Sequence, residues 1–113
     1  MSNLQVSEQT KRVTILTFND KLDAFNAPEA RQQINDLWDS GARHFAVNLS
    51  DISFMDSAGI AVLVNLLKKV RGSSGSMKLV QPTNPNAMRL LRMTKFDQIF
   101  EMFDTTEAAV ASF

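Results

Sequence analysis

One short stretch of the sequence combines residue types that suit a switchable contact: Asp56-Ser57-Ala58-Gly59-Ile60. Ser57 stands where a loop is expected to turn into a helix, and a helix start offers unpaired backbone N–H groups and a positive dipole end. A phosphate is tolerated there better than at most other positions. Phosphorylation of Ser57 would add about two negative charges without breaking the helix. Asp56 would add to that charge, so the pair suits a surface that a partner binds in one state and leaves in the other.

The neighbours of Ser57 suit a contact surface as well. Ala58 and Gly59 are small, which would leave the backbone open to a visiting protein or nucleotide. Met55 could be exposed beside Ser57 as part of an adaptable surface. A simpler interpretation is that Ser57 or Asp56 only caps the helix, and spacing alone favours it because Asp and Ser are among the commonest caps.

A catalytic or metal-binding use of these residues is poorly supported by the sequence. His44 is the single histidine and the chain has no cysteine, so we expect no metal site. A Ser-His-Asp hydrolase built from Ser57, His44 and an aspartate is conceivable. However, the Gly-x-Ser-x-Gly elbow is missing, which favours a polar histidine at the edge of a strand.

The totals describe an ordinary small domain. The chain has 113 residues, of which 44% are apolar and 21% charged, so we expect a single domain over residues 1–113. Twelve basic residues balance twelve acidic ones, which argues against direct binding to nucleic acid or an anionic membrane. The first twelve residues are polar and no apolar run could span a membrane, so we expect a cytoplasmic protein.

The residues around Ser57 must be positioned by alternating strands and helices. Extended segments are predicted near Leu4–Glu8 and over Val13–Phe18, with a turn at Asn19-Asp20. A helix is then predicted from a cap at Asn26, followed by Pro28 and Glu29, to Gly41.

Further along, a short apolar strand over Phe45–Leu49 is followed by a loop from Ser50 to Asp56. A second helix is predicted over Ser57–Arg71, with an apolar stripe on one face. The remaining predicted elements are a strand over Met77–Val80, a helix from Asn84-Pro85 to Met93 and a weak strand near Ile99–Phe103. A last short helix is predicted after them, with Asp104 and Glu107 forming a capping box at its start. This order predicts an α/β fold: a mixed sheet of four to five strands with about four helices packed against it.

Several of these residues carry a resemblance to a known family. The run from Val47 to Ile60 resembles the signature of STAS domains, specifically the bacterial anti-sigma factor antagonists. Lys21-Leu22-Asp23 is similar to the family's Gly-x-Leu-Asp turn, although Asp20 replaces the usual glycine, and Ala87–Lys95 followed by Phe96 is similar to its third helix. Ala58 stands where many members have a second serine. The length and the order of elements match over essentially the whole chain.

The resemblance implies a partner-switching regulator without catalytic activity or cofactor. In the family, a serine kinase that is itself the anti-sigma factor phosphorylates the motif serine and then releases the antagonist, and a separate serine phosphatase resets it. Carried over, Ser57 would be the phosphoacceptor, and with the resemblance added the switch is favoured over the cap. The expected partner-binding residues are Asp23, Met55, Asp56, Ala58, Gly59 and Ile60.

The alternative within the same family is a constitutive subunit of a signalling or lipid-transport assembly. Such a protein binds its partners without a phosphate. The intact Ser57 favours the switch.

Overall fold

The computed structural model describes residues 3–8 and 12–113 of the chain. Its sheet contains the strands β1 (Leu4–Glu8), β2 (Thr14–Leu22), β3 (His44–Met55), β4 (Ser76–Val80) and β5 (Met102–Phe103). Its helices are α1 (Ala27–Asp39), α2 (Ser57–Arg71), α3 (Pro85–Met93) and α4 (Thr106–Ala111), with a short 3-10 turn, η1 (Phe96–Gln98). The strands lie side by side in chain order. β1 is antiparallel to β2 and the remaining pairs are parallel, which confirms the predicted mixed α/β sheet.

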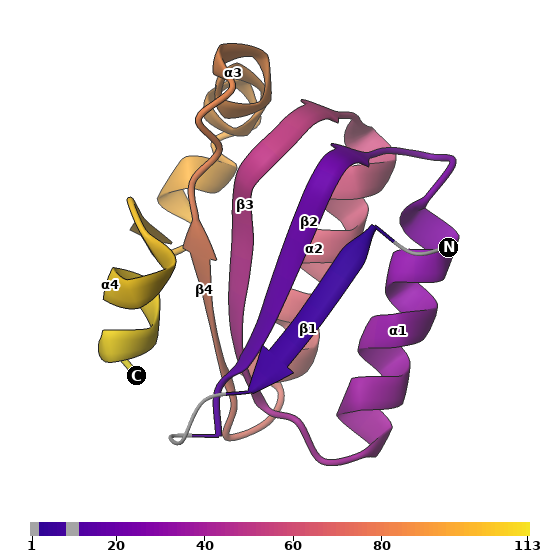
Figure 1. Ribbon diagram of the computed structural model, residues 1–113, viewed down its shortest axis with the longest axis vertical. Coiled ribbons are helices and arrows are strands. Elements are labelled where there is room, and N and C mark those ends of the chain that lie inside the picture. Colours follow the sequence, from indigo (N-terminus) through magenta and orange to yellow (C-terminus); the bar gives the residue numbers. More distant parts are fainter. Residues whose placement is uncertain (1–2, 9–11) are drawn as a thin grey trace.

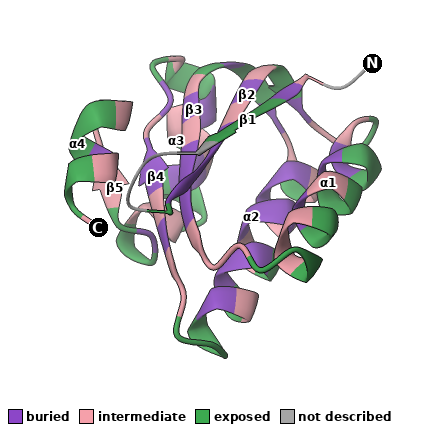
Figure 2. Ribbon diagram, turned by 60° about the horizontal axis from the view of Figure 1, so that its bottom comes forward, coloured by how far each residue is buried: buried purple, intermediate pink, exposed green. Residues whose placement is uncertain are grey.

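The helices form layers around this sheet. α1 and α2 lie against one face, α4 lies on the other face over β3, β4 and β5, and α3 lies at the end where β3 finishes (Figure 1). Their inner sides are buried and their outer sides exposed (Figure 2). β2 explains the arrangement: Leu16, Phe18 and Leu22 join the main core beneath α1 and α2, whereas Ile15, with Val13 just before the strand, joins a smaller cluster beneath α4. Alternate strand residues point to opposite faces, so one strand supplies both layers.

Two predicted breaks in the strands are wrong. β2 does not turn at Asn19-Asp20 but continues to Leu22, and β3 does not end at Leu49 but continues to Met55, so the loop expected from Ser50 to Asp56 is mostly strand. The extra pairing carries two register shifts, between Thr17 and Asn19 and between Asp20 and Lys21 of β2. Bulges of this kind add residues to one strand and interrupt the two-residue alternation that marks a strand in a sequence.

Asp20 adopts the backbone geometry expected of the glycine that it replaces. Its φ of 69° lies in the left-handed region, where glycine is favoured and aspartate is tolerated better than most residues. The Ser53 Oγ lies 2.8 Å from the Asp20 carbonyl oxygen and 2.9 Å from its Oδ1. These contacts hold the unusual backbone at the point where β2 and β3 continue together past Leu49.

The helix starts follow the sequence only in part. α2 begins at Ser57 and ends at Arg71 as predicted, and the Asn84 side chain caps α3 by accepting from the backbone of Asn86 and Ala87. Asn26 occupies the cap position of α1, but its side chain makes no cap bond. α4 is capped by Thr105 rather than by Asp104, whose carboxylate instead accepts a hydrogen bond from Gln81.

In the part of the chain that the structure describes, no helix is long and apolar enough to cross a membrane. The same residues contain no group of three or more His, Cys, Asp or Glu side chains that could hold a metal ion.

Candidate functional site

Ser57 is the first residue of α2 and lies at the end of the sheet where β2 and β3 finish. Its side chain is exposed, and no residue in the described part of the chain hydrogen-bonds to its hydroxyl group. The fifteen-residue helix behind it presents a positive dipole end at this position. The hydroxyl is therefore accessible and already stands where an added phosphate is electrostatically favoured.

Asp56 caps the helix, which decides between the two candidates for that role. Its Oδ1 accepts hydrogen bonds from the backbone of Ala58 at 2.9 Å and of Gly59 at 3.1 Å. Asp56 therefore satisfies two of the orphan N–H groups of the first turn, and the Ser57 hydroxyl makes no cap bond. The same carboxylate also reaches sideways, since its Oδ2 accepts from the Ala24 N–H at 3.1 Å. Asp56 thus fastens the loop after β2 to the start of α2.

The loop from Asp23 to Asn26 is closed by its own side chains. The Asp23 Oδ1 accepts from the backbone N–H groups of Phe25 and Asn26, at 3.1 and 3.2 Å. The Asn26 side chain returns the contact by accepting from the Asp23 N–H at 2.9 Å and donating to the Lys21 carbonyl at 2.6 Å. Asn26 therefore stabilises this loop instead of the helix that follows it.

Gly59 brings α2 into direct contact with the end of β2. A Cβ atom at this position would lie 2.1 Å from the Leu22 carbonyl oxygen and 2.9 Å from the carbonyl carbon. The same oxygen accepts from the Asp56 N–H at 3.4 Å. Only glycine permits so close an approach, which places the Asp23–Asn26 loop beside Ser57.

The structure separates the predicted partner-binding residues into two groups. Asp23, Asp56 and Ala58 are partly exposed around Ser57. Met55, Gly59 and Ile60 are buried. The expected exposure of Met55 is wrong, because only 6% of its surface is accessible and its side chain lies in the main core. The expected openness of the backbone at Gly59 is also wrong, because Leu22 covers it.

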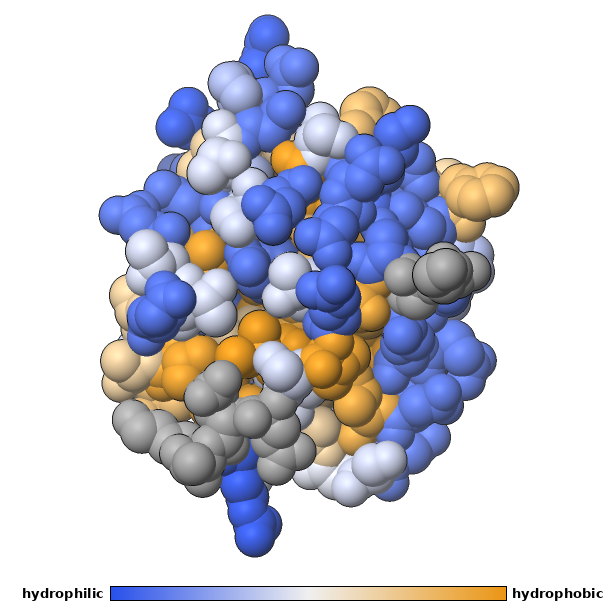
Figure 3. Space-filling view, in the orientation of Figure 1, coloured by the Kyte–Doolittle hydropathy of each residue, from blue (hydrophilic) through white to orange (hydrophobic). Residues whose placement is uncertain are grey.

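Sequence reasoning missed the apolar side chains that are exposed at this end of the sheet. Phe25, in the loop after β2, is 93% exposed; Phe54, near the end of β3, is 48% exposed; and Met93, at the end of α3, is 69% exposed. In the space-filling view, apolar groups protrude from the mostly hydrophilic upper part of the molecule (Figure 3). A signal existed for Phe25, because this aromatic residue lies in a short segment between Asp23 and Asn26, two turn-forming residues.

Phe54 and Met93 border a shallow hollow between β3 and α3. It has a volume of about 240 Å³, and Met55, Ala87 and Leu90 also line it. β4 pairs with β3 only as far as Asn48, so α3 occupies the side of β3 that no strand covers here. The loop with Phe25 follows β2, on the other side of β3. Ser57 therefore has apolar surface on either side.

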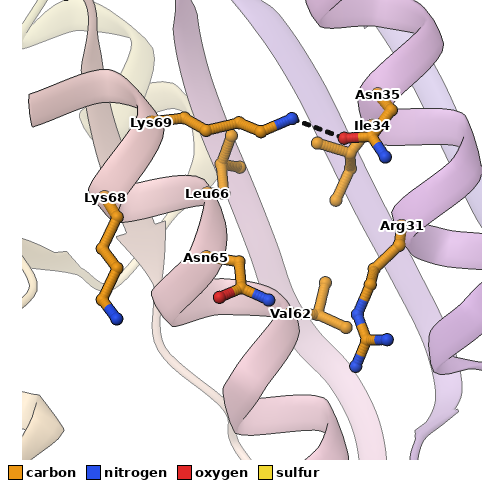
Figure 4. A pocket seen from close by; sticks show the side chains of 8 residues that line it. All are labelled: Arg31, Ile34, Asn35, Val62, Asn65, Leu66, Lys68 and Lys69. Carbon is orange, nitrogen blue, oxygen red and sulfur yellow. Dashed lines mark hydrogen bonds between the residues drawn. The ribbon is translucent and has the colours of Figure 1, made fainter. Parts of the chain in front are cut away.

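A second hollow, between α1 and α2, lies apart from Ser57. It has a volume of about 320 Å³, with an apolar floor of Ile34, Val62 and Leu66 (Figure 4). Its rim holds Arg31, Asn35, Asn65, Lys68 and Lys69. The Lys69 ammonium donates to the Asn35 side chain at 2.5 Å, which ties the two helices together. Lys69 thus has a structural use in the helix pair.

The hydrolase considered from the sequence does not form. His44 is the first residue of β3 and Ser57 lies two residues after its last, Met55, so the two side chains lie at opposite ends of the strand. The His44 Nδ1 instead lies 2.8 Å from the Ser76 Oγ.

Comparison with known proteins is decisive for the family. The model of the STAS domain matches residues 5–109. The chain belongs to the STAS domain family. This STAS domain is 33% identical, over 99 residues and 87% of each chain, to a Thermotoga maritima protein provisionally named an anti-sigma factor antagonist. It is 31% identical over 90 residues to the anti-sigma-B factor antagonist of Bacillus subtilis, covering 80% of this chain and 81% of that one.

A solved structure agrees with these relatives. The crystal structure of a Thermotoga maritima protein with the same provisional name matches this STAS domain with a TM-score of 0.89 at 30% identity. The match covers 96% of this chain and 92% of the other. The resemblance drawn from the Val47–Ile60 run is thereby confirmed.

The double role of Asp56 predicts a graded response to substitution. Asp56→Ala removes the cap and the bond to Ala24, and we expect it to lower the free energy of unfolding by about 2 kcal/mol. Asn caps as well as Asp but has only one acceptor oxygen, so Asp56→Asn should lose only the Ala24 bond, about 1 kcal/mol. Urea unfolding monitored by circular dichroism measures both. Asp51→Ala, at an exposed position of β3, is the control and should change stability by less than about 0.5 kcal/mol. An Asp56→Ala protein as stable as wild type would contradict the assignment.

Proposed function

We propose that this STAS domain, over residues 1–113, is an anti-sigma factor antagonist that is controlled by phosphorylation of Ser57. In its unphosphorylated form it binds an anti-sigma factor that is a serine kinase. The anti-sigma factor then releases the sigma factor that it held. The kinase transfers a phosphate from ATP to Ser57 and then releases the antagonist, and a serine phosphatase restores the original state. The domain itself catalyses no reaction.

The observation that carries this proposal is the free, exposed hydroxyl of Ser57 at the start of α2. A neighbouring residue, Asp56, already caps the helix, so phosphorylation of Ser57 removes no stabilising bond from the fold. The switch therefore acts on the surface and not on the folding of the domain. The basis of the switch is electrostatic. Phosphorylation adds negative charges next to the Asp56 carboxylate, on the face that the partner contacts when Ser57 is unphosphorylated.

The names of the relatives support the same role. The Bacillus subtilis relative is an antagonist of an anti-sigma factor, and the Thermotoga maritima relative carries the same type of name. A constitutive subunit of a larger assembly would share the fold but would need no accessible hydroxyl at this position.

The direct test is the intact mass of the protein after incubation with ATP and the candidate serine kinase encoded in the same genome. We expect wild type to gain one phosphate and Ser57→Ala to gain none. Ser74→Ala is the control, because Ser74 is exposed beyond the far end of α2, and this variant should gain the phosphate. No gain in wild type, with a kinase shown to be active on another substrate, would favour the constitutive subunit.

A further inference from the structure

Phe25 has no structural role that accounts for its exposure. The residue is 93% exposed, more than any other large apolar residue in the described part of the chain. Single exposed apolar residues are common on protein surfaces, but most keep part of their area against the fold. An aromatic ring with nearly all of its surface in water can still bury a large area against a second molecule.

The loop that carries Phe25 is held rigidly. Every backbone N–H from Asp23 to Ala27 has an acceptor within the protein. These acceptors are the side chains of Asn26, Asp56 and Asp23, and the Asp23 carbonyl. A loop fixed in this way loses little conformational entropy when a partner binds. The binding free energy gained by burying its exposed ring is therefore not offset by the cost of ordering the backbone.

The position of the ring is coupled to Ser57. The Asp56 carboxylate holds Ala24 with one oxygen and the first turn of α2 with the other, so Phe25 and Ser57 each adjoin a residue held by the same side chain. A kinase that receives the Ser57 hydroxyl in its catalytic site must cover this end of the sheet. Phe25 is then within the covered area, at a spacing from Ser57 that the fold determines.

We infer that Phe25 is the main apolar anchor by which the anti-sigma factor kinase of the proposed function recognises this STAS domain. The inference rests on that proposed function. The partner would offer an apolar pocket, sized for an aromatic ring, next to its phosphoryl-transfer site. The contribution of Phe25 to affinity does not depend on the phosphorylation state of Ser57, whereas the charge on Ser57 decides whether the complex forms. Large aromatic side chains near the centre of an interface commonly dominate its affinity in this way.

The test compares the binding of single variants of the full chain to the candidate kinase from the same genome by isothermal titration calorimetry with ADP. We expect Phe25→Ala to raise Kd by about 100-fold and Phe25→Leu, which keeps an apolar side chain, by about 10-fold. The control is Val6→Ala, an exposed apolar residue of β1 beside the end of α1 remote from Phe25, which should bind within about twofold of wild type. Thermal unfolding of Phe25→Ala should match wild type, because the ring makes few contacts in the folded chain.

The possible results separate this inference from the function beneath it. Equal binding of wild type and Phe25→Ala overturns the anchor and leaves the proposed function intact. No binding of the wild type, with a kinase shown to be active, overturns the proposed function and the anchor with it. The other molecule that could cover Phe25 is a second copy of this chain, and analytical ultracentrifugation tests for it. If the wild type is a dimer that Phe25→Ala dissociates, while kinase binding stays unchanged, the assignment of Phe25 to the kinase interface is overturned.

Discussion

Replacing Ser57 with aspartate is expected to weaken binding to the anti-sigma factor kinase by about 100-fold or more. The substitution places a permanent negative charge at the start of α2, next to the Asp56 carboxylate. The dipole of the helix and the exposure of the position let the fold accept this charge. An interface formed around a neutral hydroxyl cannot accept it as easily, because the charge must lose its water without gaining a partner.

The control for this prediction separates charge from size. Asn has nearly the shape of Asp without its charge, so Ser57→Asn should bind much more tightly than Ser57→Asp if electrostatics controls the switch. Ser57→Ala should bind like wild type and stay bound in the presence of ATP. Binding can be measured by calorimetry with the same kinase. Equal affinities of the Asp and Asn variants would mean that the volume of the side chain, and not phosphate-like charge, decides binding.

The second large effect concerns stability. We expect Gly59→Ala to lower the free energy of unfolding by about 3 kcal/mol. The added methyl group would lie 2.1 Å from the Leu22 carbonyl oxygen, which is backbone and cannot rotate away. Either α2 or the end of β2 must move, although alanine is otherwise the better helix former. The expected movement pulls the Asp23–Asn26 loop away from Asp56, so partner binding should weaken as well.

Gly72→Ala is the matched control, because Gly72 lies at the other end of α2. A Cβ atom there would meet its nearest neighbours at 3.5 and 3.7 Å, which is ordinary contact, and φ is −83°. Its stability should therefore change by less than about 0.5 kcal/mol. Chemical denaturation of both variants measures the difference. If Gly59→Ala were as stable as Gly72→Ala, the close contact between α2 and β2 would not be a constraint on the site.

Much of the fold could be predicted because its signals are local. The bounds of α2 follow from an apolar periodicity that a fifteen-residue helix repeats several times, and the Asn84-Pro85 pair marks the start of α3 through bonds within one turn. The alternation of strands and helices predicted the mixed sheet. The Val47–Ile60 run identified the family, and it placed Ser57 at a helix start.

The second half of β3 was missed because its pairing with β2 changes register. Its inward residues Leu49, Ile52 and Met55 are three positions apart, and not two, since each register shift gives β3 one extra residue. That spacing conceals a strand in the sequence and makes Met55 look like a loop residue available to a partner. Only the pairing with β2 shows that it faces the core.

The family, the order of the elements and the position of Ser57 on the second helix could be predicted from the sequence, because each depends on residues close together in the chain. Which residues surround that serine depends instead on contacts between distant segments. Asp56 reaches Ala24 across 32 positions of sequence, and Gly59 packs against the Leu22 carbonyl. Phe25 becomes part of the same surface through these contacts. Such contacts depend on how two strands end side by side, which is a property of the assembled sheet and not of any one segment.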